Sequence, residues 1–218
     1  MTFGNVRSAC LWSLLFVLAR SAGADGWTVK TSMSAPRSSA VAGVVNGILY
    51  VAGGHDGTRD SPSLQAYNPA TDSWTNGAAM NLQDGGNTGR YEGAGGVIDG
   101  KLYLAGGWRT SPALPTSSLQ IYNPADNTWT TGTSLPILSG CSAGAVINRK
   151  LYLLTACDGY GGYRQFLHVY DPDAPSWTQK SSLPSVQVGA AAVVISNLLY
   201  VVGGNDGNAP VWRPRDPP

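Results

Sequence analysis

One short phrase occurs four times in this chain, and it constrains the fold more than any other feature of the sequence. The phrase begins with Leu-Tyr, and in three of its four copies it ends with Gly-Gly. The copies begin at Leu49, Leu102, Leu151 and Leu199, so they are separated by 53, 49 and 48 residues. A period of about 50 residues indicates an array of repeated units that pack on one another.

A second phrase fixes where each repeat folds back. It reads Leu, two residues, Tyr, Asn-Pro or Asp-Pro and then Trp, and its copies span residues 64–74, 119–129 and 167–177. Such runs are typical of a strand, a turn and the start of another strand. The two phrases predict four strands per repeat, near 40–45, 48–53, 63–67 and 74–78 in the first. No helix longer than two turns is expected within residues 40–205.

Together the two phrases resemble the kelch repeat, whose marks are a double glycine that closes one strand, then a Tyr and a Trp separated by a turn. In the first copy these marks are Gly53-Gly54, Tyr67 and Trp74. The second copy has Gly106-Gly107, Tyr122 and Trp129, and the third keeps only Tyr170 and Trp177. The resemblance covers nearly all of residues 27–207 and implies an all-β, kelch-type β-propeller with four visible blades. The Tyr and Trp side chains are expected to pack between blades.

The last repeat supplies only two strands before the chain becomes rich in proline, so the propeller domain is placed at residues 25–207. Residues 208–218 are expected to be an irregular tail, because proline cannot sit in an interior strand. The ring is then incomplete, or it is a compact four-blade ring with an irregular seam. An open blade edge exposes unpaired backbone groups, so self-association through residues 190–204 is expected.

The first 24 residues differ from the rest. An arginine, Arg7, precedes an apolar run from Ala9 to Ala19, and small residues follow at 22–24. This pattern predicts a secretory signal peptide over residues 1–24 and a secreted or periplasmic protein. The run is too short to span a bilayer, and nothing later is long enough. A net charge of +1 gives no electrostatic footprint for nucleic acid.

Two cysteines remain after the predicted cleavage, Cys141 and Cys157. They lie at the far ends of one predicted hairpin, one residue out of register, so both a disulfide and two buried thiols remain open. Two cysteines and two distant histidines do not have zinc spacing, so neither a metal nor a cofactor is expected. For the same reason, a resemblance to the kelch-like copper-radical galactose oxidases finds no support in the sequence.

Loops before the first strand and after the second strand of each repeat share one face of the propeller, which is the candidate binding face. Asp-Gly pairs there are turn formers, and a lone His55 is typical of a surface position. Arg37 and Arg90 begin innermost strands and either hold an anionic group or bridge neighbouring blades. The ligand-binding candidates on this face are the polar and aromatic side chains of Arg37, His55, Arg59, Arg90, Trp108, Arg109, Tyr160 and Arg164.

The sequence favours a secreted binding or interaction module without catalysis, whose ligand is a protein or a carbohydrate. Nucleophile, phosphate-loop and zinc-protease motifs are lacking. The alternative is a sugar-processing enzyme similar to the kelch-like sialic-acid mutarotases, in which Arg37, Arg90 and Glu92 would hold and deprotonate an acidic sugar. Glu92 is the only glutamate of the chain and so the best candidate acid or base, but glycoside hydrolysis needs two carboxyl groups.

Overall fold

The computed structural model describes residues 27–80 and 89–206. The predicted signal peptide and the whole of the predicted tail lie outside these residues. Every regular element in the described part of the chain is a β-strand, and no helix in that part is long and apolar enough to cross a membrane. The prediction of an all-β fold is confirmed.

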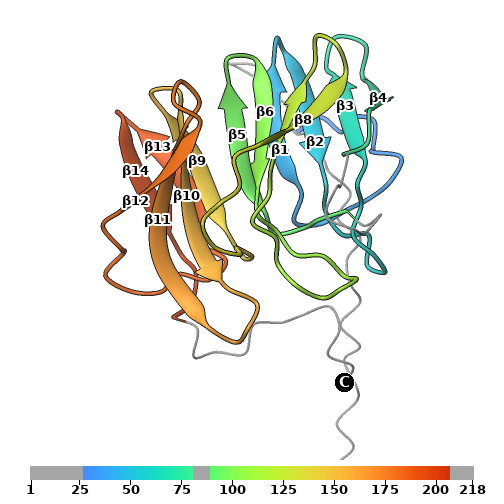
Figure 1. Cartoon of the computed structure of the whole chain (residues 1–218). Helices are drawn as coiled ribbons and strands as arrows, with labels where there is room; N and C mark the ends of the chain where they lie inside the picture. The colour runs from blue at the N-terminus through green and yellow to red at the C-terminus, as the bar shows by residue number, and fades with distance from the viewer. Residues whose placement is uncertain (1–26, 81–88, 207–218) are drawn as a thin grey trace, which may run out of the picture.

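Three complete four-stranded sheets and one hairpin follow one another along the chain (Figure 1). The first sheet contains β1 (Val41–Val45), β2 (Ile48–Ala52), β3 (Leu64–Asn68) and β4 (Ser73–Gly77). The second contains β5 (Ala94–Ile98), β6 (Lys101–Ala105), β7 (Leu119–Asn123) and β8 (Thr128–Gly132). The third contains β9 (Ala143–Ile147), β10 (Lys150–Cys157), β11 (Tyr163–Asp171) and β12 (Ser176–Lys180), and the hairpin is β13 (Ala191–Ile195) with β14 (Leu198–Val202).

Each complete sheet is an antiparallel meander in chain order, which makes it one blade of a propeller. The repeated phrases explain the register, because Leu49 of β2 pairs with Tyr67 of β3, and Tyr67 pairs with Trp74 of β4. The first turn is tight because Asn46 and Gly47 both adopt positive φ angles, 49° and 78°, as a two-residue hairpin requires. The four strands of the first blade lie within one residue of their predicted bounds.

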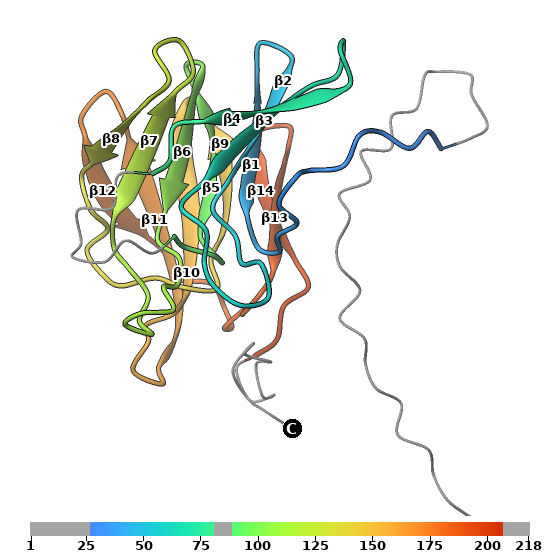
Figure 2. The ribbon, with the colours of Figure 1, turned by 90° about the vertical axis from the view of Figure 1, so that its right-hand side faces the viewer.

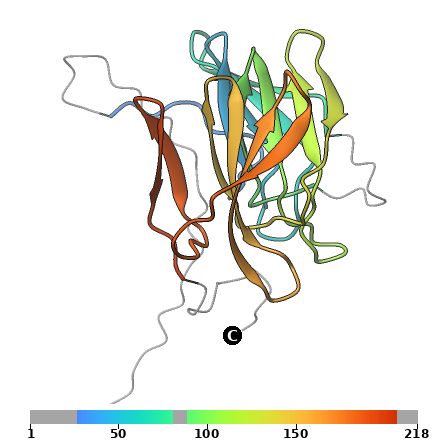
Figure 3. The same ribbon diagram turned by 60° about the vertical axis from the view of Figure 1, so that its left-hand side comes forward.

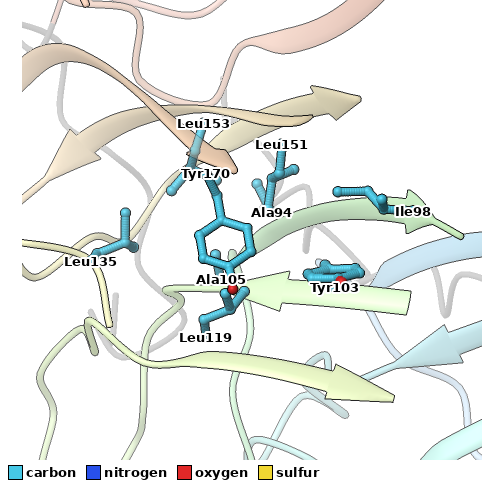
Figure 4. Close-up of a cluster of buried hydrophobic side chains, with 9 residues drawn as sticks. All are labelled: Ala94, Ile98, Tyr103, Ala105, Leu119, Leu135, Leu151, Leu153 and Tyr170. Atoms are coloured by element: carbon cyan, nitrogen blue, oxygen red, sulfur yellow. The ribbon is translucent and has the colours of Figure 1, made fainter. Parts of the chain in front are cut away.

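The hydrophobic core lies between blades rather than within one of them. Figure 4 shows the cluster between the second and third blades, where Tyr103 and Leu119 meet Leu151, Leu153 and Tyr170. A similar cluster joins the first blade to the second. Blades approach closely at the innermost strands, since a Cβ atom at Gly96 would lie 2.6 Å from Cγ2 of Val146. The predicted inter-blade packing is confirmed for Tyr122 and Tyr170, which lie in these clusters, whereas the buried Tyr67 packs on Trp74 of its own blade.

The tryptophans have a second role, because each holds the segment that precedes its own blade. Trp129 Nε1 donates a hydrogen bond to the carbonyl of Ala78 at 2.8 Å, and Trp177 Nε1 donates to that of Thr133 at 2.8 Å. Trp74 Nε1 donates in the same way to Thr31, at 2.7 Å. These indole rings are half-buried, so they form a clamp between blades as well as packing on the adjacent tyrosine.

The ring is open at the fourth blade. In the described part of the chain β14 pairs only with β13, and Figure 3 shows this red hairpin at one end of the array. Its apolar side chains are exposed: Val193, Ile195, Leu198, Tyr200 and Val202 have 43–61% of their surface accessible. At the other end Trp27 is 75% exposed and belongs to no strand. An open blade edge is therefore present, while self-association through it stays a prediction.

Candidate binding site

The innermost strands β1, β5, β9 and β13 approach one another around an axis, and the loops at one end of them enclose a cavity of about 320 Å³. In Figure 2 the loops of this end lie at the bottom of the view, opposite the short β1–β2 turn. All four repeats contribute to the lining. The lining residues described are Ser39, Ala40, Glu92, Gly93, Cys141, Ser142, Val188, Gly189, Ala190 and Asn205.

One position of the repeat supplies the centre of this cavity. Ser39, Glu92, Cys141 and Gly189 are equivalent residues, and their φ angles are 55°, 55°, 52° and 70°. Such angles are uncommon for residues other than glycine. Because all four repeats share them, the conformation belongs to the architecture: it lets the Glu92 N–H donate to the Ser39 carbonyl, 3.0 Å away in the neighbouring blade. The side chain at this position can therefore vary from repeat to repeat without changing the backbone.

Glu92 is the only charged residue among the described residues that line the cavity. Its Oε2 accepts a hydrogen bond from the Cys141 thiol, with 3.3 Å between Sγ and oxygen. A hydrogen bond with Cys157, burial and the negative charge of Glu92 together raise the pKa of the Cys141 thiol far above its usual range. Cys141 is therefore a neutral donor at the cavity wall, not a thiolate nucleophile.

Arg37 and Arg90 point away from this cavity. The Nη1 atom of Arg37 donates to the carbonyls of Gly53 and Ser63, at 3.0 and 3.1 Å, and burial lowers the pKa of its guanidinium. Nη1 of Arg90, a residue only 1% exposed, donates to Ser118 Oγ at 2.5 Å. Both arginines therefore tie the second strand to the third within their own blade. The carbonyl of Arg90 also accepts the Gly54 N–H of the first blade at 2.8 Å, so this residue contacts a neighbouring blade through its backbone.

His55 and Trp108 occupy equivalent positions just after the second strand of their blades, and both are 6% exposed. His55 forms an antiparallel bridge with Ser38, and Trp108 forms one with Tyr91. The Gly57 N–H donates to His55 Nδ1 at 3.0 Å. The expected surface position of His55 is therefore wrong, because the loop folds over the imidazole. Trp108 packs beneath the cavity against Cys141.

The accessible rim of the binding face comes from loop tips. Tyr160 is 77% exposed, and the side chain of Arg59 is 81% exposed. Arg164 forms an ion pair with Asp158 at 2.5 Å, while Asp158 also accepts the backbone N–H groups of Tyr160 and Gly162. Arg109 is half-buried in its loop, where its N–H donates to the Leu114 carbonyl. The predicted residues thus divide into exposed rim positions and buried supports.

Both cysteines are buried as free thiols. Cys157 lies opposite Gly140, one residue from Cys141, as the hairpin register requires. The two thiols nevertheless interact, since a hydrogen bond with Cys157 is the largest cause of the raised pKa of Cys141. Among the described residues no group of three His, Cys, Asp or Glu side chains could hold a metal ion.

Sequence reasoning missed Ser39 and Gly189 as cavity residues and considered Cys141 only for a disulfide. The signal was present in the repeats, because these residues align with Glu92. The pattern of strand alternation places Arg37 and Arg90 near the axis. It does not predict where a long side chain places its guanidinium group.

Four-stranded meanders arranged around an axis, with a cavity built from one repeat position, define a kelch-type β-propeller. The chain contains kelch repeats, because the Kelch motif model matches residues 36–81 and 89–136. Kelch-like ECH-associated protein 1B of Danio rerio is 35% identical over 99 residues, which cover 44% of this chain and 16% of that protein. Kelch-like protein 36 of Rattus norvegicus is 30% identical over 149 residues, 66% of this chain and 23% of that protein.

The chain thus spans less than a quarter of the length of these relatives. Among solved structures, the one titled "Structure of YjhT" has a TM-score of 0.70 at 18% identity and covers 82% of this chain and 63% of that chain. At this identity the likeness concerns the fold alone.

Proposed function

We propose that this chain is a protein-binding kelch module whose partner lies on the loop face and places one side chain in the axial cavity. The observation that carries the proposal is the cavity itself, about 320 Å³ in volume and lined by residues of all four repeats, which include one variable position in each. Tyr160 and Arg59 are exposed residues of loops on the same face. An exposed tyrosine or arginine beside a cavity is typical of an interface anchor.

The charge of the cavity decides which side chain it would accept. Glu92 contributes a carboxylate, and Ser39 and Ser142 contribute hydroxyl groups, while the nearest arginines are engaged elsewhere. A carboxylate favours a cationic or hydrogen-bond-donating group and repels an anion. The sugar-processing alternative needs Arg37, Arg90 and Glu92 to converge on one acidic ligand. Only Glu92 lines the cavity, so binding a partner's donor group is the better-supported function.

Site-specific photo-crosslinking tests the proposal. A benzophenone amino acid is placed at Tyr160 on the loop face, and as a matched control at Thr71, an exposed turn residue at the opposite end of the first blade. We expect one discrete partner to crosslink from position 160 and not from position 71. Glu92→Gln should weaken that crosslink without changing the thermal unfolding curve. Equal crosslinking from both positions would exclude the loop face as the binding surface.

We also propose that the module acts outside the cytoplasm, with support only from the apolar pattern of residues 1–24. Expression of the full chain with an epitope tag at the C-terminus measures this. Recovery of a shortened chain in the medium or periplasm is the expected result. Full-length protein retained in the cytoplasm would contradict it.

A further inference from the structure

The axial cavity combines one charged group with small, mostly apolar walls. Its polar side chains include the carboxylate of Glu92 and the hydroxyl groups of Ser39 and Ser142. A cation that leaves water needs a counter-charge, whereas a hydrocarbon stem needs apolar surroundings. The lining therefore fits a side chain with an apolar stem and a cationic end. Apolar side chains, or none, form the rest of the wall at Ala40, Gly93, Val188, Gly189 and Ala190.

The order of residues along the chain gives the depth of these groups. The strand β13 runs from the loop face toward the turn at residues 196–197, on the opposite side of the propeller. Val188 precedes Gly189, the equivalent of Glu92 in the fourth repeat, so Val188 lies nearer the loop face than the level of Glu92. Two backbone hydrogen bonds with Asn205, at 2.9 and 3.0 Å, fix it there. A side chain that enters from the loop face therefore passes Val188 before its end reaches Glu92.

The contacts of Glu92 favour an ammonium group over a guanidinium group. A guanidinium pairs best with a carboxylate through two parallel hydrogen bonds, one to each oxygen. Because Glu92 Oε2 already accepts the Cys141 thiol, with 3.3 Å between oxygen and Sγ, this two-pronged pairing is poorly matched. An ammonium group needs only single acceptors for its three N–H donors. The carboxylate of Glu92 and the hydroxyl groups of Ser39 and Ser142 are acceptors of this kind.

We propose that the axial cavity binds the unmodified side chain of a lysine from the partner protein. Its ammonium group lies at Glu92, and its methylene stem lies along Val188 and the small residues of the wall. This inference rests on the proposed function of the loop face and adds the identity of the inserted side chain. An arginine, an acetylated lysine and an acidic residue each lack part of this match, in shape, in charge or in both.

Blocked amino acids test the side chain without the partner. Nα-acetyl-lysine N-methylamide has the ammonium group as its only charge, and it is titrated into the ¹⁵N-labelled full-chain protein while amide chemical shifts are recorded. We expect saturable shifts that include the amides of Glu92 and Gly189. The corresponding arginine compound and the uncharged Nε-acetyl-lysine compound should each bind at least about fivefold more weakly. Equal binding of the three compounds would overturn the proposal.

Variants at one repeat position test the role of the charge in both directions. Glu92→Gln keeps the shape of the side chain and should weaken binding of the lysine compound at least about tenfold. Gly189→Asp adds a second carboxylate at the equivalent position, where a Cβ atom would meet nothing within 4 Å and the other three repeats carry side chains at positive φ. It should tighten binding roughly threefold, whereas the isosteric Gly189→Asn should not.

Asp173→Asn is the matched control, since this carboxylate is 65% exposed on the opposite face and its loss should leave binding unchanged. No loss with Glu92→Gln together with no gain with Gly189→Asp would overturn the lysine assignment. If the lysine compound does not bind while a partner still crosslinks from position 160, the lysine assignment alone fails and the proposed function stands. Saturable binding of the compound without any such crosslink would support the lysine site and contradict the partner's position on the loop face.

Discussion

Substitution of Gly43 by alanine tests the tight packing of the first blade against the second. An added Cβ would lie 2.6 Å from Cγ2 of Val97 and 2.9 Å from Cδ1 of Leu102. Real Cβ atoms do not approach other heavy atoms so closely, so the second blade must move. Leu102 is fully buried and has little room to do so.

The expected cost follows from two opposing effects. Overpacking a core by one methyl group destabilises a protein by about 1–3 kcal/mol. Replacing glycine by alanine in a strand regains about 0.5–1 kcal/mol, because the unfolded chain has less conformational freedom to lose. Gly43→Ala should therefore lower the free energy of unfolding by about 1–2 kcal/mol, measured by urea titration, and lower Tm by about 4 °C.

A compensating substitution identifies the cause. Val97→Ala removes the methyl group that the new Cβ would strike, so the double variant should be more stable than the sum of the single effects by about 1 kcal/mol. Val193, which occupies the position of Gly43 in the exposed fourth blade, supplies the control: Val193→Ala should change stability by less than about 0.5 kcal/mol. Additive effects of Gly43→Ala and Val97→Ala would refute the steric explanation.

Two further predictions concern titratable groups. Hydrogen bonds from Tyr67, Arg149 and Lys150 lower the pKa values of Asp72, Asp99 and Asp171, respectively. This stability is present above the ordinary aspartate pKa of about 4 and is lost as pH falls through the lower folded-state values, so urea midpoints should be level near neutrality and fall below about pH 4. A midpoint that rises on acidification would contradict this. The raised pKa of Cys141 predicts slow alkylation of the native protein by iodoacetamide at pH 8 and rapid alkylation in urea, as followed by peptide mapping. Rapid native labelling would show that the thiol is not held as described.

The fold could be predicted from the sequence because the signals repeat. Leu49, Tyr67 and Trp74 recur at matching places, and each copy removes alternatives that a single strand pattern would leave open. Strand bounds followed from turns that only certain residues can form, such as Asn46-Gly47. The sequence predicted an open edge at the fourth blade because no fourth Leu-x-x-Tyr phrase occurs in residues 205–218.

The candidate site was harder to predict, because it depends on where the functional group of each side chain lies. Arg37 precedes an innermost strand, yet its guanidinium reaches outward to the carbonyl groups of Gly53 and Ser63. His55 is buried by its own loop through a hydrogen bond from Gly57, which no periodicity encodes. Cys141 reaches both Glu92 and Cys157 because its φ is positive, and residue type alone does not predict this for cysteine.

The hydrogen bonds of the tryptophans imply an order in which the blades fold and unfold. Trp129 donates to the carbonyl of Ala78, and Trp177 donates to that of Thr133, so the ends of the first and second blades are each held by the blade that follows in the chain. The N-terminal part of the chain leaves the ribosome first. We therefore expect the outer strand of a blade to stay frayed until the next blade has folded. Loosening a later blade would also free the strand before it, so unfolding should spread from the C-terminal hairpin backward, one blade at a time.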